Sequence, residues 1–304
     1  MNGDAPVSVL VPATTANLGC AFDCAAIAVT LFLRVSATPQ ASGFAVGYRG
    51  PNAEQIPSDE SNLIVKAIRH YAARSGSKIL GARIAVENEI PLGVGLGSSA
   101  AAIVAGILLG AGLCGKTLHA REILALALEL ESHPDNIAAA VHGGMVVAAV
   151  AGEPPAVLVS KAEVSNDLDF VVVIPDIPLP TEKARAVLPQ QYSRQDVVAN
   201  LQRTALLTAA FFSGENLSPE LFRDRLHQPY RSGLVPGIAE CLALQHDGLV
   251  GIFLSGAGSA VMAIAQKDAS AIGEALVAEF RSKGVGAKAV VLKADNVGAR
   301  ILSS

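Results

Sequence analysis

The hydrophobic and polar positions of this chain follow two different periods. Alternating or continuous apolar runs rich in β-branched residues predict strands at 7–11, 25–38, 82–91, 143–152 and 168–176. Apolar residues spaced by three and four predict helices at 61–76, 118–132 and 194–212, and Thr117 is the expected N-cap of the second. Strands and helices are mixed along the chain without a fixed repeat, which favours an α+β fold.

The C-terminal half shows the same mixture. A helix is predicted at 194–212 and another at 219–226, followed by a strand, a glycine-rich turn and a strand within 248–266. An amphipathic helix at 268–284 ends at a glycine, and a strand at 287–295 follows it. Because the mixed segment 153–166 precedes the buried strand 168–176, we expect an N-terminal domain at 1–165 and a C-terminal domain at 166–304.

Composition narrows the class of protein. Of the 304 residues, 51% are apolar and 16% are charged, which is enough apolar surface for a sizeable core and argues against disorder. The net charge of −4 argues against a nucleic-acid-binding protein. The four cysteines form no CxxC pair, so a zinc site is not expected, and their spacing fits reduced thiols of a cytoplasmic protein.

A long uncharged stretch at 92–114 is compatible in length with a membrane span. Its first third is rich in glycine and serine, and its helical part, 100–114, has only about 15 residues, fewer than a span needs. We therefore expect a buried helix here and no contact with a membrane.

The stretch PLGVGLGSSAAA, residues 91–102, follows a predicted strand and opens this helix. Glycines allow close approach of a ligand to the backbone, and the free N–H groups of a first helical turn attract anions. The pattern therefore indicates a phosphate-binding loop. A glycine-rich segment that only packs in the core, with an ordinary serine cap, would have the same sequence pattern. The glycine spacing and the absence of a following lysine exclude a Walker A loop, and the spacing also excludes the dinucleotide fingerprint.

The loop resembles the phosphate loop of the GHMP kinases, P-x-G-x-G-L-G-S-S-A, and matches it throughout. The resemblance implies a two-domain fold, with a βαβ-type nucleotide-binding domain followed by a ferredoxin-like α/β sandwich. It also implies ATP as the phosphoryl donor. The implied ATP-binding residues are Asn62, near the adenine, and Pro91, Leu92, Gly93, Val94, Gly95, Leu96, Gly97, Ser98 and Ser99.

Three further segments resemble the branch of this family whose acceptor is L-homoserine: 11–24, 131–144 and 251–264. The chain departs from the branch pattern at Cys20-Ala21, where Pro-Gly is usual, and at Ser132, where glycine is usual. The resemblance implies transfer of a phosphoryl group from ATP to the homoserine hydroxyl, in threonine biosynthesis, by a homodimer. Mg²⁺ is the implied metal, bound by Ser98 and Glu131, with Glu129 as the alternative acid.

Site residues of the acceptor are implied by these matches and by two shorter segments, 181–189 and 227–237, which resemble the same branch. Two arginines would bind the carboxylate and two aspartates the ammonium group. The glycine-rich turn at 255–259 would form a backbone wall. The implied substrate-binding residues are Asn17, Asp23, His133, Asp135, Asn136, Arg185, Arg231 and Gly256.

Three of the residues are assigned to catalysis: Asn136, Thr181 and Arg185. Several GHMP kinases have an aspartate, a candidate catalytic base, where this chain has Asn136. An amide is a poor proton acceptor and cannot take that role. We therefore expect catalysis by positioning and electrostatics, with Thr181 orienting the reacting groups and the proton leaving to a phosphate oxygen or to water.

Two other functions stay open at this point. One is a GHMP kinase with another acceptor, such as threonine or an isoprenoid alcohol, although Arg185 and Arg231 favour an amino-acid carboxylate. The other is a non-catalytic nucleotide-binding regulator, which would be expected to have lost phosphate or metal residues, whereas Ser98, Ser99 and Glu131 are all present.

Overall fold

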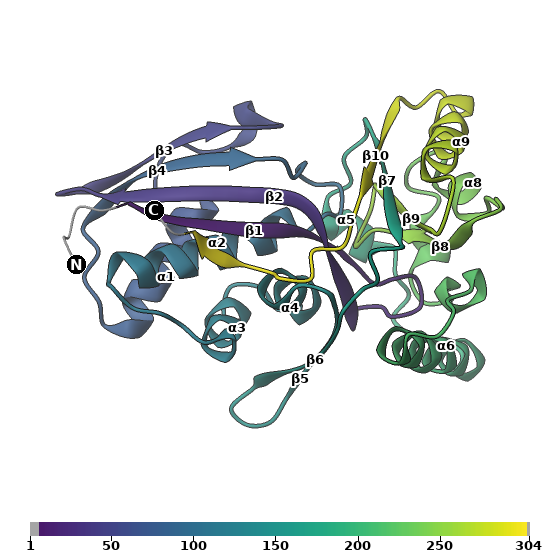
Figure 1. Ribbon diagram of the computed structural model, residues 1–304, viewed down its shortest axis with the longest axis horizontal. Helices are drawn as coiled ribbons and strands as arrows, with labels where there is room; N and C mark the ends of the chain where they lie inside the picture. The colour runs from purple at the N-terminus through teal and green to yellow at the C-terminus, as the bar shows by residue number, and fades with distance from the viewer. Residues whose placement is uncertain (1–5, 303–304) are drawn as a thin grey trace.

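The computed structural model describes residues 6–302, which form two β-sheets with helices packed on each (Figure 1). The larger sheet has the order β11-β1-β2-β4-β3, and a hairpin of β5 and β6 extends from the start of β2. Helices α1, α2, α3 and α4 lie on one side of this sheet, below it in Figure 1. The elements are β1 (Val7–Ala16), β2 (Ala25–Pro39), β3 (Gly43–Arg49), α1 (Leu63–Ser75), β4 (Gly81–Asn88), α2 (Ser98–Leu113), α3 (Ala120–Leu128), α4 (Pro134–His142), β5 (Met145–Ala151), β6 (Ala156–Ala162) and β11 (Arg300–Leu302).

The smaller sheet is antiparallel, with the order β10-β7-β9-β8. With the helices between its strands, this is the β-α-β-β-α-β connectivity of ferredoxin-like folds. The predicted α+β fold in two parts is thereby confirmed. The elements are β7 (Asp169–Pro175), α5 (Thr181–Ala186), α6 (Arg194–Ser213), α7 (Gln228–Arg231), α8 (Ile238–Leu242), β8 (Leu249–Leu254), β9 (Val261–Ala265), α9 (Ala269–Ser282) and β10 (Ala287–Leu292), with short 3₁₀ turns at Ala53–Gln55 and Pro219–Phe222.

Helix α2 is buried on nearly every side, since it packs against α1, α4 and β1. Its small residues allow close packing: a Cβ on Gly106 would lie 2.5 Å from the Ile64 carbonyl oxygen of α1. This burial explains the uncharged stretch in the sequence. Among residues 6–302, no helix combines the length and the apolar character that a membrane crossing requires.

Several predicted element boundaries differ from those of the structure. Strand β1 continues past residue 11 to Ala16, because the polar residues Thr14 and Thr15 are buried inside the protein. The N-cap of α3 is His119 and not Thr117, and the Glu122 carboxylate accepts the His119 backbone N–H. The helix predicted at 219–226 is only a 3₁₀ turn, Pro219–Phe222.

The patterns also missed whole strands. Strands β3 and β6 have largely exposed or half-buried side chains, so their apolar signal is weak. Strand β6 lies within the segment 153–166, and β11, near the C-terminus, pairs with β1 of the larger sheet. The domain division at residue 165 stays a prediction, with the qualification that the chain returns to the first sheet at its end.

Candidate active site

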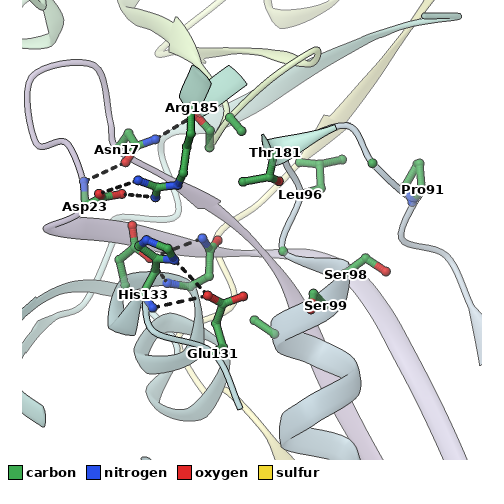
Figure 2. Close-up of a pocket in the computed structure, with 18 of the residues that line it drawn as sticks. Asn17, Asp23, Pro91, Leu96, Ser98, Ser99, Glu131, His133, Thr181 and Arg185 are labelled. Atoms are coloured by element: carbon green, nitrogen blue, oxygen red, sulfur yellow. Dashed lines mark hydrogen bonds and ion pairs between the residues drawn. The ribbon is translucent and has the colours of Figure 1, made fainter. Parts of the chain in front are cut away.

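One cavity of about 230 Å³ lies where the two sheets meet, and residues from six separate segments line it (Figure 2). The β1–β2 loop, the β4–α2 loop, the α3–α4 loop, α5, α7 and the β8–β9 turn all contribute. Most of the residues predicted from the sequence meet here: Asn17, Asp23, Pro91, Gly93, Gly95, Leu96, Gly97, Ser98, Ser99, Glu131, His133, Asp135, Asn136, Thr181, Arg185, Arg231 and Gly256.

The glycine-rich loop forms one wall of this cavity. Gly95 and Gly97 have φ of 89° and 69°, a conformation that side chains disfavour. A Cβ on Gly95 would lie 2.0 Å from the Ser255 carbonyl oxygen, and one on Gly97 would lie 1.9 Å from the Thr14 hydroxyl oxygen. The two glycines are therefore required by close contacts with neighbouring segments as well as by the backbone conformation.

The same loop leaves backbone donors free. Within residues 6–302, none of the N–H groups of residues 93–97 donates a hydrogen bond to another protein group. Gly97 is the N-cap of α2, and Ser98 and Ser99 begin its first turn, where the N–H groups also lack intrahelical partners. A row of free N–H groups at the N-terminus of a helix is suited to binding an anion such as phosphate.

An ion pair lies on the opposite side of the cavity, between Arg185 of α5 and Asp23 of the β1–β2 loop (Figure 2). The two Nη atoms of Arg185 donate to the two carboxylate oxygens at 3.1 and 2.8 Å, a bidentate arrangement. Asn17 supports the loop, because its Oδ1 accepts the Asp23 N–H at 2.9 Å and its Nδ2 donates to the Gly256 carbonyl. Nε of Arg185 is buried and has no partner among the described residues.

Arg231 of α7 is 1% exposed and lies beside this pair. Its Nε donates to the Ala184 carbonyl oxygen at 3.0 Å, and its Nη1 lies 3.2 Å from Nδ1 of His227 and 3.3 Å from the Gly256 carbonyl. Burial lowers the pKa of Arg231 to about 10, with a further contribution from the charge of Arg185, so the guanidinium stays protonated at neutral pH. Two arginine charges therefore face the cavity, and one of them, Arg185, is paired with the Asp23 carboxylate.

Glu131 and His133 enter the cavity from the α3–α4 loop. His133 Nδ1 lies 2.9 Å from a Glu131 carboxylate oxygen. This hydrogen bond lowers the pKa of Glu131 and raises the pKa of His133, so the carboxylate is ionised at neutral pH. The alternative acid, Glu129, instead lies at the end of α3 and pairs with His70 and Arg74 of α1.

The first turn of α4 supplies Asp135 and Asn136. Asp135 is 2% exposed, and burial raises the pKa of its carboxyl to about 6. Asn136 accepts a 2.7 Å hydrogen bond at Oδ1 from the Thr14 hydroxyl, and its backbone N–H donates to Asp135 Oδ1. The Thr14 contact orients the amide so that its NH₂ group is the donor: Nδ2 donates to Asp135 Oδ1 at 3.4 Å, which leaves one of its two N–H bonds for a ligand.

Three predicted residues do not line the cavity. Asn62 is the N-cap of α1, where its Oδ1 accepts the Ile64 N–H and its Nδ2 donates to the Pro57 carbonyl. The Leu92 N–H donates to Asn52 Oδ1, and the Val94 side chain is buried. The assignment of all three to ATP stays a prediction.

The sequence patterns missed other residues around the site. Thr14 orients Asn136, and Phe22 has the guanidinium groups of Arg231 and Arg185 over its ring at 5.1 and 5.7 Å. The unusual Cys20 is buried against the Leu221 carbonyl, and its own carbonyl accepts hydrogen bonds from Asn200 and Thr204. Thr14 and Phe22 lie within the matched segment 11–24, so that segment was the available signal.

A phosphate-type loop facing a pocket of paired charges, in a fold with these two sheets, defines the class of GHMP kinases. Residues 62–144 match the family model described as the GHMP kinases N terminal domain. The chain is 38% identical over 305 residues to the homoserine kinase of Caldanaerobacter subterraneus subsp. tengcongensis, covering 98% of this chain and 96% of that protein. It is 39% identical over 303 residues to the homoserine kinase of a Synechococcus species, covering 97% of each.

A solved structure agrees with these relatives. The crystal structure of homoserine kinase from Cytophaga hutchinsonii superposes with a TM-score of 0.86 at 28% identity, covering 98% of this chain and 97% of that one. The chain belongs to the homoserine kinase family.

Proposed function

We propose that this protein transfers the γ-phosphoryl group of ATP to the side-chain hydroxyl of L-homoserine and forms O-phospho-L-homoserine. The observation that carries the proposal is the shared cavity: free loop N–H groups form one wall, and Asp23, Arg185 and Arg231 form another. A phosphorylated donor and a zwitterionic acceptor would thus meet in one place. The names of the relatives support the same acceptor.

The charges of the second wall match those of an amino acid. A homoserine carboxylate would bind Nη2 of Arg231, which the protein leaves free, with the Arg185 guanidinium beside it. The ammonium group would bind Asp23 and approach Asp135. Because the Asp23–Arg185 pair already exists, a zwitterion would add one charge of each sign to it, which leaves the net charge of the pocket unchanged. An isoprenoid alcohol has no ammonium group to place there.

Mg²⁺ would be held by Ser98 and Glu131. Both side chains offer oxygen, both line the cavity, and the Glu131 carboxylate is ionised. Within residues 6–302, no group of three or more His, Cys, Asp or Glu residues is arranged to hold a metal alone, so nucleotide phosphates and water would complete the coordination. When bound, the metal would neutralise charge on the phosphates. The loop N–H groups would orient those phosphates.

The chain's own residues would promote transfer by position. Thr181, at the start of α5, and the amide of Asn136, oriented by Thr14, would hold the acceptor hydroxyl in line with the phosphoryl group. Arg185 would stabilise charge in the transition state. The hydroxyl proton would leave to a phosphate oxygen or to water. Asp135 is not assigned as a base, although its raised pKa makes it the carboxyl group to test.

The test of the reaction is turnover of purified protein with ATP, Mg²⁺ and L-homoserine. Formation of ADP would be followed by a coupled assay, and the product would be identified by mass spectrometry and ³¹P NMR. L-threonine and mevalonate are the competing acceptors, and we expect a kcat/KM for each at least about a hundredfold lower. Mevalonate lacks the ammonium group and would leave buried charges unpaired, whereas threonine carries its hydroxyl one carbon closer to the ammonium group and would place it out of line with the phosphoryl group. Equal turnover of either one would reject the proposed acceptor. A protein that binds ATP and phosphorylates none of the three would instead be a regulator.

The proton route has its own test. The logarithm of kcat would be measured against pH for the wild type and for Asp135→Asn. We expect both profiles to have the same shape near pH 6. An ionisation near pH 6 that disappears in the variant would make Asp135 the general base and would contradict catalysis by positioning alone.

We also propose a homodimer in the cytoplasm. The cytoplasmic location rests on the four free thiols. The dimer is supported by an uncharged, exposed stripe along α6 formed by Val198, Leu201, Ala205, Ala209 and Phe212. Val198, Leu201 and Phe212 are 43%, 63% and 46% exposed, which is unusual for a stripe at helical spacing. Antiparallel pairing of two such stripes around Ala205 would place Arg194 near Glu215 of the partner subunit, so that opposite charges meet.

A further inference from the structure

His227 lies behind the site and does not line the cavity. It is the residue before the short helix α7, and its side chain is fully buried. Its ring stacks on Phe22 with ring centroids 4.9 Å apart. A buried histidine between two segments of the site invites the question of what its two ring nitrogens do.

The partners of His227 determine its tautomer. Nε2 lies 2.7 Å from the Gly19 carbonyl oxygen, which can only accept, so Nε2 carries the proton. Nδ1 lies 3.2 Å from Nη1 of Arg231, which can only donate, so Nδ1 is the acceptor. Both requirements are met by one neutral form of the imidazole.

A protonated ring would not fit this position. Nδ1–H would then face a guanidinium N–H, and two cations would be buried side by side. Burial lowers the pKa of His227 to about 4, which agrees with the neutral form. The Asp224 carboxylate lies 3.6 Å from Nε2 and acts to raise the pKa of His227, but burial has the larger effect. The same carboxylate also accepts the backbone N–H groups of His227 and Gln228 and the Nδ2 of Asn200.

The contact with Nδ1 determines the orientation of Arg231. Nε of Arg231 donates to the Ala184 carbonyl, and Nη1 donates to His227 and to Gly256. Within residues 6–302, Nη2 makes no hydrogen bond, so it is the nitrogen left for a ligand in the cavity. Without an acceptor at Nδ1, Nη1 would keep only its 3.3 Å contact with the Gly256 carbonyl, and the direction of Nη2 would be held less firmly.

The contact with Nε2 connects Arg231 to the opposite wall of the acceptor site. Gly19 belongs to the β1–β2 loop that also carries Asn17 and Asp23. Phe22 of the same loop stacks with the His227 ring and has both guanidinium groups over its own ring. The His227 imidazole therefore contacts both parts of the acceptor site: Arg231, which is proposed to bind the carboxylate, and the β1–β2 loop, which carries the Asp23 proposed to bind the ammonium group. It holds the two at a fixed distance from each other.

We propose that His227 is a positioning residue that holds Arg231 and the β1–β2 loop in the geometry that recognises the acceptor amino acid. The inference rests on the proposed function, because it assigns His227 to homoserine binding and not to ATP binding. It acts through Arg231 and does not touch the substrate.

Two substitutions separate the two ring nitrogens. In His227→Asn, Oδ1 takes the place of Nδ1 and can accept from Arg231, whereas the donor to Gly19 is lost. In His227→Gln, Nε2 takes the place of the ring Nε2 and can donate to Gly19, whereas the acceptor for Arg231 is lost. We expect His227→Gln to raise the KM for homoserine about tenfold, the effect of losing one hydrogen bond to a charged group, with the KM for ATP nearly unchanged. His227→Asn should recover most of that loss.

Thr204→Val is the matched control, since it removes a hydrogen bond to the Cys20 carbonyl of the same loop without touching Arg231. We expect it to leave the homoserine KM close to that of the wild type. Thermal unfolding of all three variants, and calorimetric binding of homoserine in the presence of a non-hydrolysable ATP analogue, would measure folding and acceptor binding without turnover.

The outcomes are distinguishable. If wild-type protein phosphorylates homoserine and His227→Gln keeps the wild-type homoserine KM, the positioning role is wrong while the proposed function stands. The role is also wrong if Thr204→Val and His227→Gln raise the homoserine KM equally, or if both substrate KM values rise together. If the wild-type protein neither binds nor phosphorylates homoserine, both proposals fall.

Discussion

Two carboxyl groups of the site, Asp135 and Glu131, have pKa values shifted in opposite directions by their surroundings. Burial raises the pKa of Asp135 to about 6, whereas the hydrogen bond from His133 lowers the pKa of Glu131. A buried carboxyl group with a raised pKa destabilises the fold when it is ionised. A carboxyl group with a lowered pKa is ionised at neutral pH and can bind a cation. These two shifts suit Glu131 to metal binding and make Asp135 a source of instability.

The shift at Asp135 predicts a pH-dependent gain from Asp135→Asn. The folded pKa of about 6 lies above the ordinary value of 3.8, so the native state binds this proton more tightly than the unfolded state. The stabilising effect of protonation is present at low pH and is lost as the pH rises through 6. The variant should therefore be more stable than the wild type at pH 8, by up to about 3 kcal/mol for about two pKa units, and the difference should shrink towards pH 4.

Urea unfolding of both proteins at pH 8 and pH 5 would check this. A variant that is less stable than the wild type at both pH values would show that the Asp135 carboxylate makes stabilising contacts that outweigh its burial.

Contacts at Gly97 predict a severe effect of a single methyl group. In Gly97→Ala the Cβ would overlap the Thr14 hydroxyl, which also orients Asn136, so the loop and the amide must both shift. We expect a loss in kcat/KM of about a hundredfold or more, as for a displacement of about 1 Å in a catalytic group.

Gly76→Ala is the control: its φ of 67° is similar, but a Cβ there would meet nothing within 4 Å. It should cost about 1–2 kcal/mol of stability and leave kcat/KM within a few-fold. Equal loss of activity in both variants would point to backbone strain alone.

At the scale of elements, the site is built at the ends of helices. Helix α2 begins at Ser98, α4 begins at Pro134 beside Asp135, and α5 begins at Thr181. Three helix N-termini therefore point their partial positive charge towards the cavity, which favours the anionic groups of a nucleotide. Short connecting loops can then present side chains from different helices to one ligand.

Helix α1 offers a test of the nucleotide assignment of Asn62. Asn62→Ala removes the N-cap and should cost about 1 kcal/mol in the free energy of unfolding. Asn62→Asp keeps an oxygen for the Ile64 N–H and should lose little stability, but its added charge should raise the KM for ATP if the nucleotide lies close to it. Chemical unfolding and ATP titration would measure the two effects separately. An unchanged ATP KM in Asn62→Asp would leave Asn62 as a helix cap only.

At the scale of the whole molecule, the cavity exists because two sheets share one core. A continuous cluster of buried residues includes Val9 and Ile84 of the larger sheet and Phe170 and Met262 of the smaller one. Packing of this kind holds the two walls of the cavity in a fixed relation. In Figure 1 the two sheets lie side by side, with α6 on the outer surface below the smaller sheet.

The position of α6 leads to a prediction about assembly. We expect the protein to elute as a dimer in size-exclusion chromatography with light scattering, and we expect Leu201→Glu, in the middle of the exposed stripe, to shift it to the monomer. Leu80→Glu, at a similarly exposed leucine away from α6, is the control and should not change the mass. A wild-type monomer at all concentrations would reject the dimer, and a Leu201→Glu dimer would reject this surface.

Part of the fold could be predicted from local patterns. Strand β2, helix α1 with its stop at Gly76, helix α6 and the pair β8 and β9 follow from apolar periodicity and glycine positions. Strands β3 and β6 could not be predicted, because their side chains are mostly outside the core and carry little apolar signal. The short helix α7 was not predicted. The Asp224 carboxylate accepts N–H groups at its start, and this carboxylate is held in turn by Asn200 of α6, a contact distant in sequence.

The sequence by itself determined the glycine-rich loop and the helix that follows it, and predicted phosphate binding there, because glycine spacing and a following helix are local properties of the chain. It also determined most of the residues that meet in the cavity, since the matched segments carry them. Only the tertiary structure decided how their charges combine. The pairing of Asp23 with Arg185, the burial of Asp135 and the link from His227 to Arg231 join residues that are distant in sequence, or depend on burial, neither of which a local pattern records.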